Sequence, residues 1–289
     1  MTEGFDKVEV TSLISTGYVG DGYSQWSASS SGGECGLAYK MLPQPGTDQK
    51  TGVTWYAQTY GPVAIVHYST ERDISKGGAQ YKWLKSTLEG FNRTQTPYVV
   101  AIGHRASYVD TRAAKDLDMQ LYYQNLLDPL FTDNKVTAVF SGHTHVTQRH
   151  CASFKGVCKM KDTKGLYKNP QNPVFFSVGN AGAGSDLDGW TSGMLGFQYN
   201  AWWSARQAYT RVEIDGNIFK VTYVDAKNGD ILDTSMIEIE SAPACLDNAP
   251  KDSPAVKSEM SSAAVRTSCT MQAGLLSGML ALCLTLIYM

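Results

Sequence analysis

The stretch VTAVFSGHTH, residues 136–145, joins an apolar run to a glycine and a His-x-His pair. The apolar run predicts a buried β-strand. Alternate residues of an extended chain share one face, so His143 and His145 are expected to point the same way as they leave the strand. Two neutral imidazoles side by side often begin a transition-metal site, and Gly142 lets the backbone approach what they hold. The alternative is a pair of polar residues that only ends a strand.

A second segment, YVVAIGHR at residues 98–105, repeats this order of strand, glycine and histidine. Aliphatic runs without polar alternation predict strands that are covered on both faces, as in α/β folds. Functional groups of such folds lie on loops at the carboxyl ends of the strands. We therefore expect His104 to share a cleft with His143 and His145.

The rest of the pattern predicts a mixed α/β (α+β) domain. Residues 63–69 and 173–178 are expected to form further strands, and residues 209–239 a hairpin or meander with Asn228-Gly229 as its turn. Two amphipathic helices are expected between the strands. Their apolar faces are formed by Tyr81, Leu84, Leu88 and Phe91 and by Met119, Tyr122, Leu126 and Leu130.

Composition indicates an ordinary folded domain. The 289 residues are 43% apolar, which is enough to bury a sizeable core, and this length suits one large domain. The formal net charge of -2 gives no electrostatic case for binding nucleic acid.

The histidine segments also carry a family resemblance. GHR at 103–105 followed by Tyr108, and GHTH at 142–145 with Arg149 close behind, resemble the last two metal motifs of the purple acid phosphatases. These enzymes are calcineurin-like metallophosphoesterases. Other stretches are similar to the same family in the same order, namely residues 31–36, 80–84 and 92–98. The resemblance covers roughly residues 17–240.

The resemblance implies a β-sandwich flanked by helices and hydrolysis of phosphomonoesters by a binuclear metal centre. It implies that His104 and His143 bind a divalent ion (Zn, Mn or Fe(II)) and that His145 binds the other ion, usually Fe(III). Two adjacent cations would activate a water molecule and hold the phosphoryl oxygens. Arg149 is expected either to bind phosphate or to form a structural salt bridge.

The earlier metal motifs of the family have no counterpart in this sequence. Family members also use Asp-x-Gly, Gly-Asp-x-x-Tyr and Gly-Asn-His-Glu or Gly-Asn-His-Asp. We therefore expect either a fragment whose N-terminal part is missing or a degenerate protein, with at most one weakly bound divalent ion. The alternatives are a catalytically inactive, surface-anchored binding protein and another metallophosphoesterase, such as a nucleotidase or a phosphodiesterase.

The C-terminal region predicts attachment to a membrane. Residues 1–240 are expected to form the partial metallophosphoesterase domain, and residues 241–272 a Ser-, Ala- and Pro-rich linker. Residues 273–289 are apolar and uncharged, and small residues near Ser262 precede them, which indicates a glycosylphosphatidylinositol (GPI) attachment signal. A membrane-spanning anchor is the alternative. Both predict the secretory pathway and a place at the cell surface or outside the cell, although residues 1–16 show no signal peptide.

The cysteines also fit an oxidising compartment, because removal of the C-terminal tail would leave four of the six. Cys151 and Cys158 bracket a short loop and are natural partners, which leaves Cys35 to pair with Cys245. Four cysteines permit three pairings, and buried thiols are the alternative. Asn92 begins an Asn-Arg-Thr glycosylation sequon.

Overall fold

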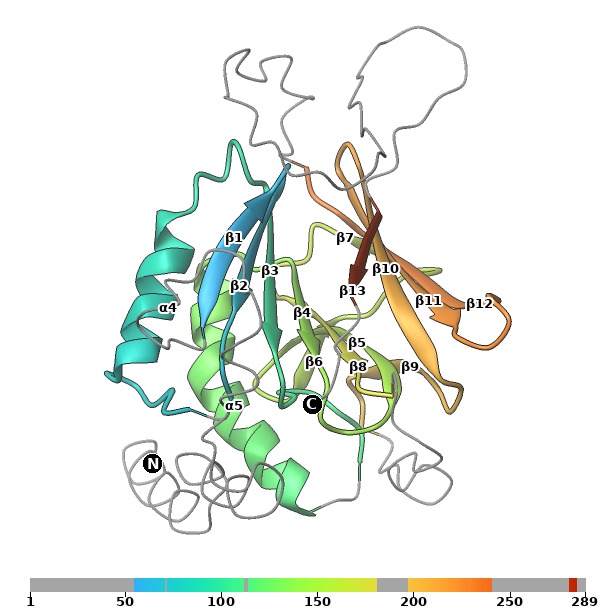
Figure 1. Cartoon of the computed structure of the whole chain (residues 1–289), viewed down its shortest axis with the longest axis horizontal. Coiled ribbons are helices and arrows are strands. Elements are labelled where there is room, and N and C mark those ends of the chain that lie inside the picture. The colour runs from blue at the N-terminus through green and yellow to red at the C-terminus, as the bar shows by residue number, and fades with distance from the viewer. Residues whose placement is uncertain (1–54, 71, 112–113, 181–196, 241–280, 285–289) are drawn as a thin grey trace, which may run out of the picture.

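The computed structural model describes residues 55–70, 72–111, 114–180, 197–240 and 281–284. These residues form two β-sheets with a shared core, and two helices cover the outer face of the larger sheet (Figure 1). The arrangement confirms the mixed α/β class and the β-sandwich flanked by helices that the sequence predicts.

The larger sheet has parallel strands at its centre and antiparallel strands at both sides. The parallel strands are neighbours in the order β2, β3, β4 and β8, and β5 runs antiparallel to β8. The full order is β1 (Tyr56–Tyr60), β2 (Val63–His67), β3 (Tyr98–Gly103), β4 (Ala138–Ser141), β8 (Val174–Val178), β5 (Thr147–Phe154) and β6 (Val157–Met160), and β9 (Asn200–Ser204) also pairs with β5.

Two helices cover one face of this sheet, α4 (Ala79–Gly90) and α5 (Ala114–Asp133). Leu84 and Leu88 stand four residues apart on α4, so both reach the core on one side of the helix. Helix α4 ends where Phe91 turns to an extended conformation. Because both faces of the central strands are then covered, every residue of β3 and β4 is buried, as their unbroken apolar runs predict.

The smaller sheet is built on the predicted meander. Strands β10 (Ala208–Asp215), β11 (Ile218–Asp225) and β12 (Ile231–Glu238) follow one another antiparallel, and Asn228-Gly229 lies in the connection from β11 to β12. The sheet is completed by β7 (Leu166–Lys168), which is parallel to β12, and by β13 (Ala281–Leu284), which is antiparallel to β10.

Aromatic side chains join the two sheets. The rings of Tyr98 and Phe219 lie 5.6 Å apart, and those of Phe176 and Tyr223 lie 6.4 Å apart. The hydroxyl of Tyr98 donates to the carbonyl of Gly216, and the hydroxyl of Tyr223 donates to the carbonyl of Gln148. Each buried tyrosine therefore adds a satisfied polar group to an apolar contact between the sheets.

The predicted membrane attachment falls mostly outside the described residues. Of the apolar segment 273–289, only β13 is described, and Ser262 and the linker 241–272 are not. Within the described ranges, neither helix is long and apolar enough to cross a membrane.

Candidate functional site

The first two predicted histidines meet because their strands are neighbours. Gly103 at the end of β3 pairs with Ser141 at the end of β4. The backbone N–H of Gly142 then donates to the carbonyl of His104 at 2.9 Å, which ties the two loops together. The rings of His104 and His143 lie 5.0 Å apart, edge to face, and both are partly exposed. The expected proximity of His104 and His143 is therefore confirmed.

The loop that carries His143 and His145 is not extended, and this corrects the expectation that both side chains leave the strand on one face. Two three-residue turns follow each other, because Thr144 N donates to Gly142 O at 2.8 Å and Val146 N donates to Thr144 O at 2.7 Å. His143 has φ of 61°, in the left-handed region that residues other than glycine rarely adopt. The turns arise because the chain must pass from β4 across β8 to reach β5.

Gly179 lies just after β8 and packs closely against the loop that carries His143 and His145. Its N–H donates to Val146 O at 3.2 Å, and a Cβ at this position would lie 2.1 Å from the carbonyl oxygen of Thr144. Such a distance is far inside van der Waals contact, and the neighbour is backbone that cannot rotate away. Only glycine at position 179 therefore allows the backbone after β8 to approach the histidine loop this closely.

We expect Gly179→Ala to lower the free energy of unfolding by about 1–3 kcal/mol, as overpacking of a fixed site does. Urea unfolding of the variant and the parent protein measures the difference. Gly90→Ala is the matched control, because a Cβ there meets no atom within 4 Å and alanine favours a helix. Equal stability of Gly179→Ala and the parent protein would contradict the close approach.

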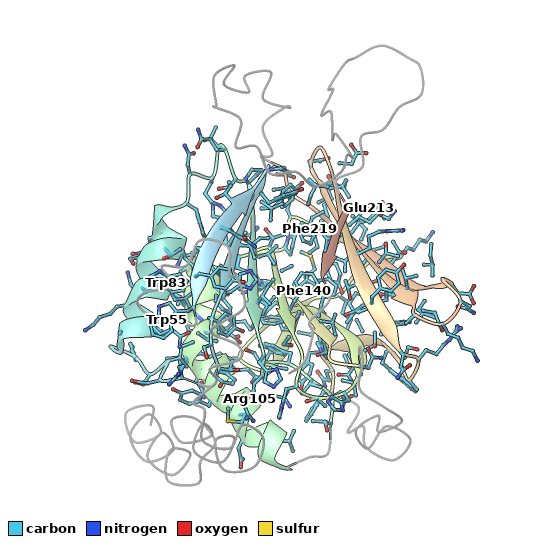
Figure 2. The ribbon with its side chains drawn as sticks, in the orientation of Figure 1. Trp55, Trp83, Arg105, Phe140, Glu213 and Phe219 are labelled. Carbon is cyan, nitrogen blue, oxygen red and sulfur yellow. A yellow bond between two sulfur atoms is a disulfide. The ribbon has the colours of Figure 1, made fainter. Side chains whose placement is uncertain are left out.

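Arg105 lies beside the histidine pair at the lower end of the larger sheet in Figure 2. It is 6% exposed, and its backbone N–H donates to Thr70 Oγ1 at 3.1 Å. Its Nη1 lies 3.3 Å from Nε2 of His143. A guanidinium can only donate hydrogen bonds, so in a hydrogen bond between these two groups Nε2 of His143 is the acceptor. Sequence analysis gave Arg105 no role beyond its place in the GHR motif.

The described residues alone do not make up a two-metal centre. Among residues 55–70, 72–111, 114–180, 197–240 and 281–284, no three His, Cys, Asp or Glu side chains gather closely enough to hold a metal ion. His104 and His143 are together, but His145 does not join them in such a group. Moreover, Nε2 of His143 lies 3.3 Å from Nη1 of Arg105, a cationic group. Metal binding by these three histidines therefore stays a prediction.

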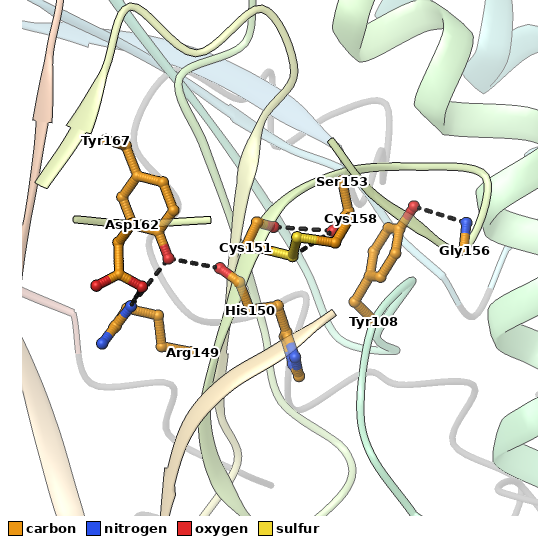
Figure 3. Close-up of a disulfide and its surroundings, with 9 residues drawn as sticks. All are labelled: Tyr108, Arg149, His150, Cys151, Ser153, Gly156, Cys158, Asp162 and Tyr167. Atoms are coloured by element: carbon orange, nitrogen blue, oxygen red, sulfur yellow. Dashed lines mark hydrogen bonds and ion pairs between the residues drawn. A yellow bond between two sulfur atoms is a disulfide. The ribbon is translucent and has the colours of Figure 1, made fainter. Parts of the chain in front are cut away.

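Arg149 forms the structural salt bridge, which was one of its two predicted roles. Its Nε and Nη2 donate to the two carboxylate oxygens of Asp233 at 2.6 and 3.2 Å, and its Nη1 donates to Asp162 and to the hydroxyl of Tyr167. Its side chain is only 6% exposed, and its guanidinium is directed at Asp162 (Figure 3). Burial works against the charge, but the hydrogen bond to Asp233 and the nearby carboxylates outweigh it and raise the pKa of Arg149. The structure therefore shows the salt-bridge role of Arg149, and phosphate binding by this residue stays a prediction.

The hairpin of β5 and β6 contains the disulfide between Cys151 and Cys158, which confirms that pairing (Figure 3). Cys35 and Cys245 lie outside the described residues. The sequon residue Asn92 is exposed just after α4, where its side-chain oxygen accepts from the N–H of Thr94 at 3.0 Å. Its glycosylation stays a prediction.

A buried carboxyl group fixes the loop that follows His104. The hydroxyl of Tyr108 donates to Asp128 Oδ2 at 2.6 Å, and the N–H of Lys155 at the tip of the β5–β6 hairpin donates to the same oxygen at 2.7 Å. Burial raises the pKa of Asp128 to about 7, although both hydrogen bonds oppose the shift. Sequence analysis missed Asp128, because one acidic residue on an amphipathic helix is normally read as part of its solvated face.

Comparisons with known proteins agree with the family resemblance seen in the sequence. The family model of the calcineurin-like phosphoesterases matches residues 22–147. The chain is 38% identical over 165 residues to "Probable inactive purple acid phosphatase 9" of Arabidopsis thaliana, covering 54% of this chain and 24% of that protein. It is 28% identical to "Purple acid phosphatase 1" of Ipomoea batatas, covering 46% and 28%. The chain thus spans about a quarter of the length of these curated relatives.

Among solved structures, purple acid phosphatase PPD1 from yellow lupin seeds superposes with a TM-score of 0.59. The match covers 72% of this chain and 36% of that one at 21% identity, so it supports the fold alone. Residues 22–147 thus match a calcineurin-like phosphoesterase domain, and the fold agrees with that match. Relatives of this chain include purple acid phosphatases, some of which are named inactive, and a "Nucleotide pyrophosphatase/phosphodiesterase" of Hordeum vulgare. The resemblance seen in the sequence is confirmed.

Proposed function

We propose that the protein acts on phosphomonoesters at the site of His104, Arg105 and His143. The observation that supports this most is the placement of the histidine pair and a guanidinium together at the ends of adjacent parallel strands in a calcineurin-like phosphoesterase fold. Imidazole and guanidinium N–H groups bind phosphate oxygens, and Arg105 brings a positive charge that does not depend on pH. Hydrolysis of the monoester is the activity that the family resemblance implies.

The test is the rate of p-nitrophenol release from p-nitrophenyl phosphate, a monoester, and from bis(p-nitrophenyl) phosphate, a diester. We expect turnover of the monoester in preference to the diester, and a fall of about 100-fold or more in kcat/KM for His143→Ala. Lys82→Ala changes an exposed residue of α4 and should leave kcat/KM unchanged. Preference for the diester would instead support a phosphodiesterase.

A second candidate is a binding protein that keeps the fold without turnover. Two observations favour it, namely the engagement of His143 Nε2 by Arg105 and the relatives that are named inactive. Isothermal titration with inorganic phosphate separates the candidates. Binding that is lost in His143→Ala, without turnover of either ester, would support the binding protein and contradict the phosphatase.

We also propose that the protein enters the secretory pathway and is held at the cell surface through its C-terminal tail. The disulfide between Cys151 and Cys158 suits an oxidising compartment. Asn92 of the sequon is exposed, as a glycosylated asparagine has to be. The apolar segment 273–289 supplies the GPI signal or membrane anchor. Release of the native protein from cells by a phosphatidylinositol-specific phospholipase would distinguish the lipid anchor from a membrane span.

A further inference from the structure

The loop that begins at His104 is buried although it has no regular secondary structure. We call residues 104–111 the His104 loop, and beyond His104 each of its residues is at most 6% exposed. Buried backbone groups have to find hydrogen-bond partners within the protein. The N–H of Asp110, for example, donates to Gln148 Oε1 at 2.8 Å, and Gln148 Nε2 donates back to the carbonyl of Asp110 at 3.0 Å. The position of His104 therefore depends on side chains that lie outside its own loop.

Helix α5 binds the His104 loop through a buried polar stripe. Gln120, Gln124 and Asp128 follow one another at intervals of one helical turn, so they lie on the same side of the helix, and all three are buried. Gln120 accepts from the N–H of Val109 at 3.0 Å, Gln124 donates to the carbonyl of Ser107 at 2.7 Å, and Asp128 accepts from the hydroxyl of Tyr108 at 2.6 Å. The stripe thus holds residues 107–109 of the loop.

The tip of the β5–β6 hairpin binds the same part of the loop. The tip is the two-residue turn Lys155-Gly156, and both of its residues have positive φ, as a tight hairpin turn requires. The N–H of Lys155 donates to Asp128 Oδ2 at 2.7 Å, and the N–H of Gly156 donates to the hydroxyl of Tyr108 at 3.1 Å (Figure 3). Both members of the Tyr108–Asp128 hydrogen bond are therefore also bound by the hairpin tip.

The disulfide between Cys151 and Cys158 joins the two strands of this hairpin next to its tip (Figure 3). Among the described strands β6 pairs with β5 alone, and their short register is interrupted by an irregularity at Ala152/Ser153. A short hairpin at the edge of a sheet has little stability of its own, so the covalent link is a main constraint on the tip. Cys151 is buried, whereas Cys158 is partly exposed and can be reached by a thiol.

We propose that the Cys151–Cys158 disulfide is a redox-sensitive control of the His104 loop, which keeps the hairpin tip on Tyr108 and Asp128 when oxidised and releases it when reduced by a thiol. The thiolate of the reductant attacks the sulfur of Cys158, the S–S bond breaks, and Cys151 leaves as a thiolate that takes up a proton. A second thiol then displaces Cys158 from the mixed disulfide. Two cysteine thiols result, and the reductant is oxidised to its own disulfide.

Release of the tip should loosen the loop without unfolding the domain. Tyr108 and Asp128 keep their mutual hydrogen bond but lose the two backbone donors of the tip. The glutamines of the α5 stripe stay bound to the loop, so the change is a local opening. The proposal rests on the proposed function only for one consequence, which is that reduction should also lower the activity of the site that contains His104.

Hydrogen exchange of the whole chain tests the proposal. The chain has other cysteines, so the measurement uses a variant with serine at the four positions Cys35, Cys245, Cys269 and Cys283, which leaves one pair. Reduction by dithiothreitol should speed exchange of the amides of residues 155, 156 and 109 by about tenfold or more, and reoxidation should reverse this. The amides of β11, in the other sheet, should not respond. Unchanged exchange at residue 109, or equal acceleration in β11, would overturn the proposal.

A second variant keeps the test decisive if the four serines disturb folding. Cys151→Ser/Cys158→Ser should show the fast exchange of residues 155, 156 and 109 without any reductant, and dithiothreitol should not increase it further. Slow exchange in this variant, equal to that of the oxidised parent protein, would show that the hairpin tip does not need the disulfide and would overturn the proposal.

NMR of the imidazole rings follows the effect to the candidate site. Reduction should shift the ring signals of His104, assigned with His104→Gln, and leave those of His67 on β2 in place. The shift should be smaller in Tyr108→Phe, which lacks the hydroxyl that joins loop, helix and tip, and an equal shift would overturn the route through Tyr108. These measurements need no ester. Absence of p-nitrophenyl phosphate turnover in the oxidised protein would therefore contradict the proposed function alone, and unchanged exchange on reduction would contradict this proposal alone.

Discussion

Replacing Arg149 by methionine should lower the free energy of unfolding by about 3–5 kcal/mol, because removal of one partner leaves buried charges without compensation. The side chains that would lose their cation are Asp233, 12% exposed, and Asp162, 20% exposed. Urea unfolding at neutral pH measures the loss. The effect is large because both oxygens of Asp233 accept hydrogen bonds from the same guanidinium.

The position of this cluster explains why its loss should affect the whole fold. Arg149 lies on β5 of the larger sheet, whereas Asp233 lies on β12 and Tyr167 on β7 of the smaller sheet. The hydroxyl of Tyr167 accepts from Arg149 at 2.9 Å and donates to the carbonyl of His150 at 3.2 Å. The cluster is therefore a polar connection across the sandwich, beside the aromatic contacts of its core.

Lys85→Met is the control. Lys85 pairs with Glu89 one turn further along α4, and the two side chains are 52% and 51% exposed. Water screens such a pair, so its removal should change stability by about 1 kcal/mol or less. Arg149→Lys keeps the charge but not the bidentate geometry and should fall between the two. Equal losses for Arg149→Met and Lys85→Met would contradict the structural role of the buried cluster.

The sequence predicted those features of the fold that depend on short segments. Unbroken apolar runs located β3 and β4, and their common parallel direction was enough to bring His104 close to His143. The periodic apolar positions of α4 and α5 and the Asn-Gly turn before β12 were likewise visible in the sequence. In each case the signal lies within about 20 residues, where periodicity and turn chemistry decide the outcome.

The remaining features depend on partners that are distant in the sequence. Asp233 stands 84 residues from Arg149, so nothing near Arg149 could decide between a salt bridge and phosphate binding. The turns at His143 follow from the order of strands, in which β8 lies between β4 and β5. The contact of Arg105 with His143 in turn depends on that turn geometry. The residues of the candidate site could therefore be predicted from the sequence. The contacts around them could be seen only in the tertiary structure.

Acid should weaken the fold through His150, which is fully buried on β5. Burial and, to a smaller extent, the charge of Arg149 lower the pKa of His150 from 6.5 to about 3. Its Nε2 lies 3.4 Å from Ser177 Oγ, and that hydroxyl donates to the carbonyl of Tyr108, so the serine oxygen accepts from a neutral imidazole. Protonation would place a charge among the rings of Tyr108 and Tyr199 in the core.

The direction of the pH effect follows from the lowered pKa. Below pH 6.5 the unfolded chain binds a proton at His150, whereas the folded chain does not bind it until the pH approaches 3. The contribution of the neutral His150 to the free energy of unfolding is therefore complete above pH 6.5 and is lost as the pH falls toward 3. Between pH 7 and pH 4 the loss should be about 3 kcal/mol. His67, whose pKa burial lowers to about 4, acts in the same direction.

Asp128 acts in the opposite direction and supplies the control. Its pKa is raised to about 7, so the folded chain holds a proton that the unfolded chain gives up, and stability rises as the pH falls from 7 toward 3.8. Urea unfolding at pH 7 and pH 4 should therefore give a smaller acid loss for His150→Gln than for the parent protein, and a larger loss for Asp128→Asn. Equal pH dependence in His150→Gln and the parent protein would mean that His150 is not held neutral by the fold. A changed dependence in both variants, with opposite signs, would identify burial as the cause, because burial disfavours the charged form of either group.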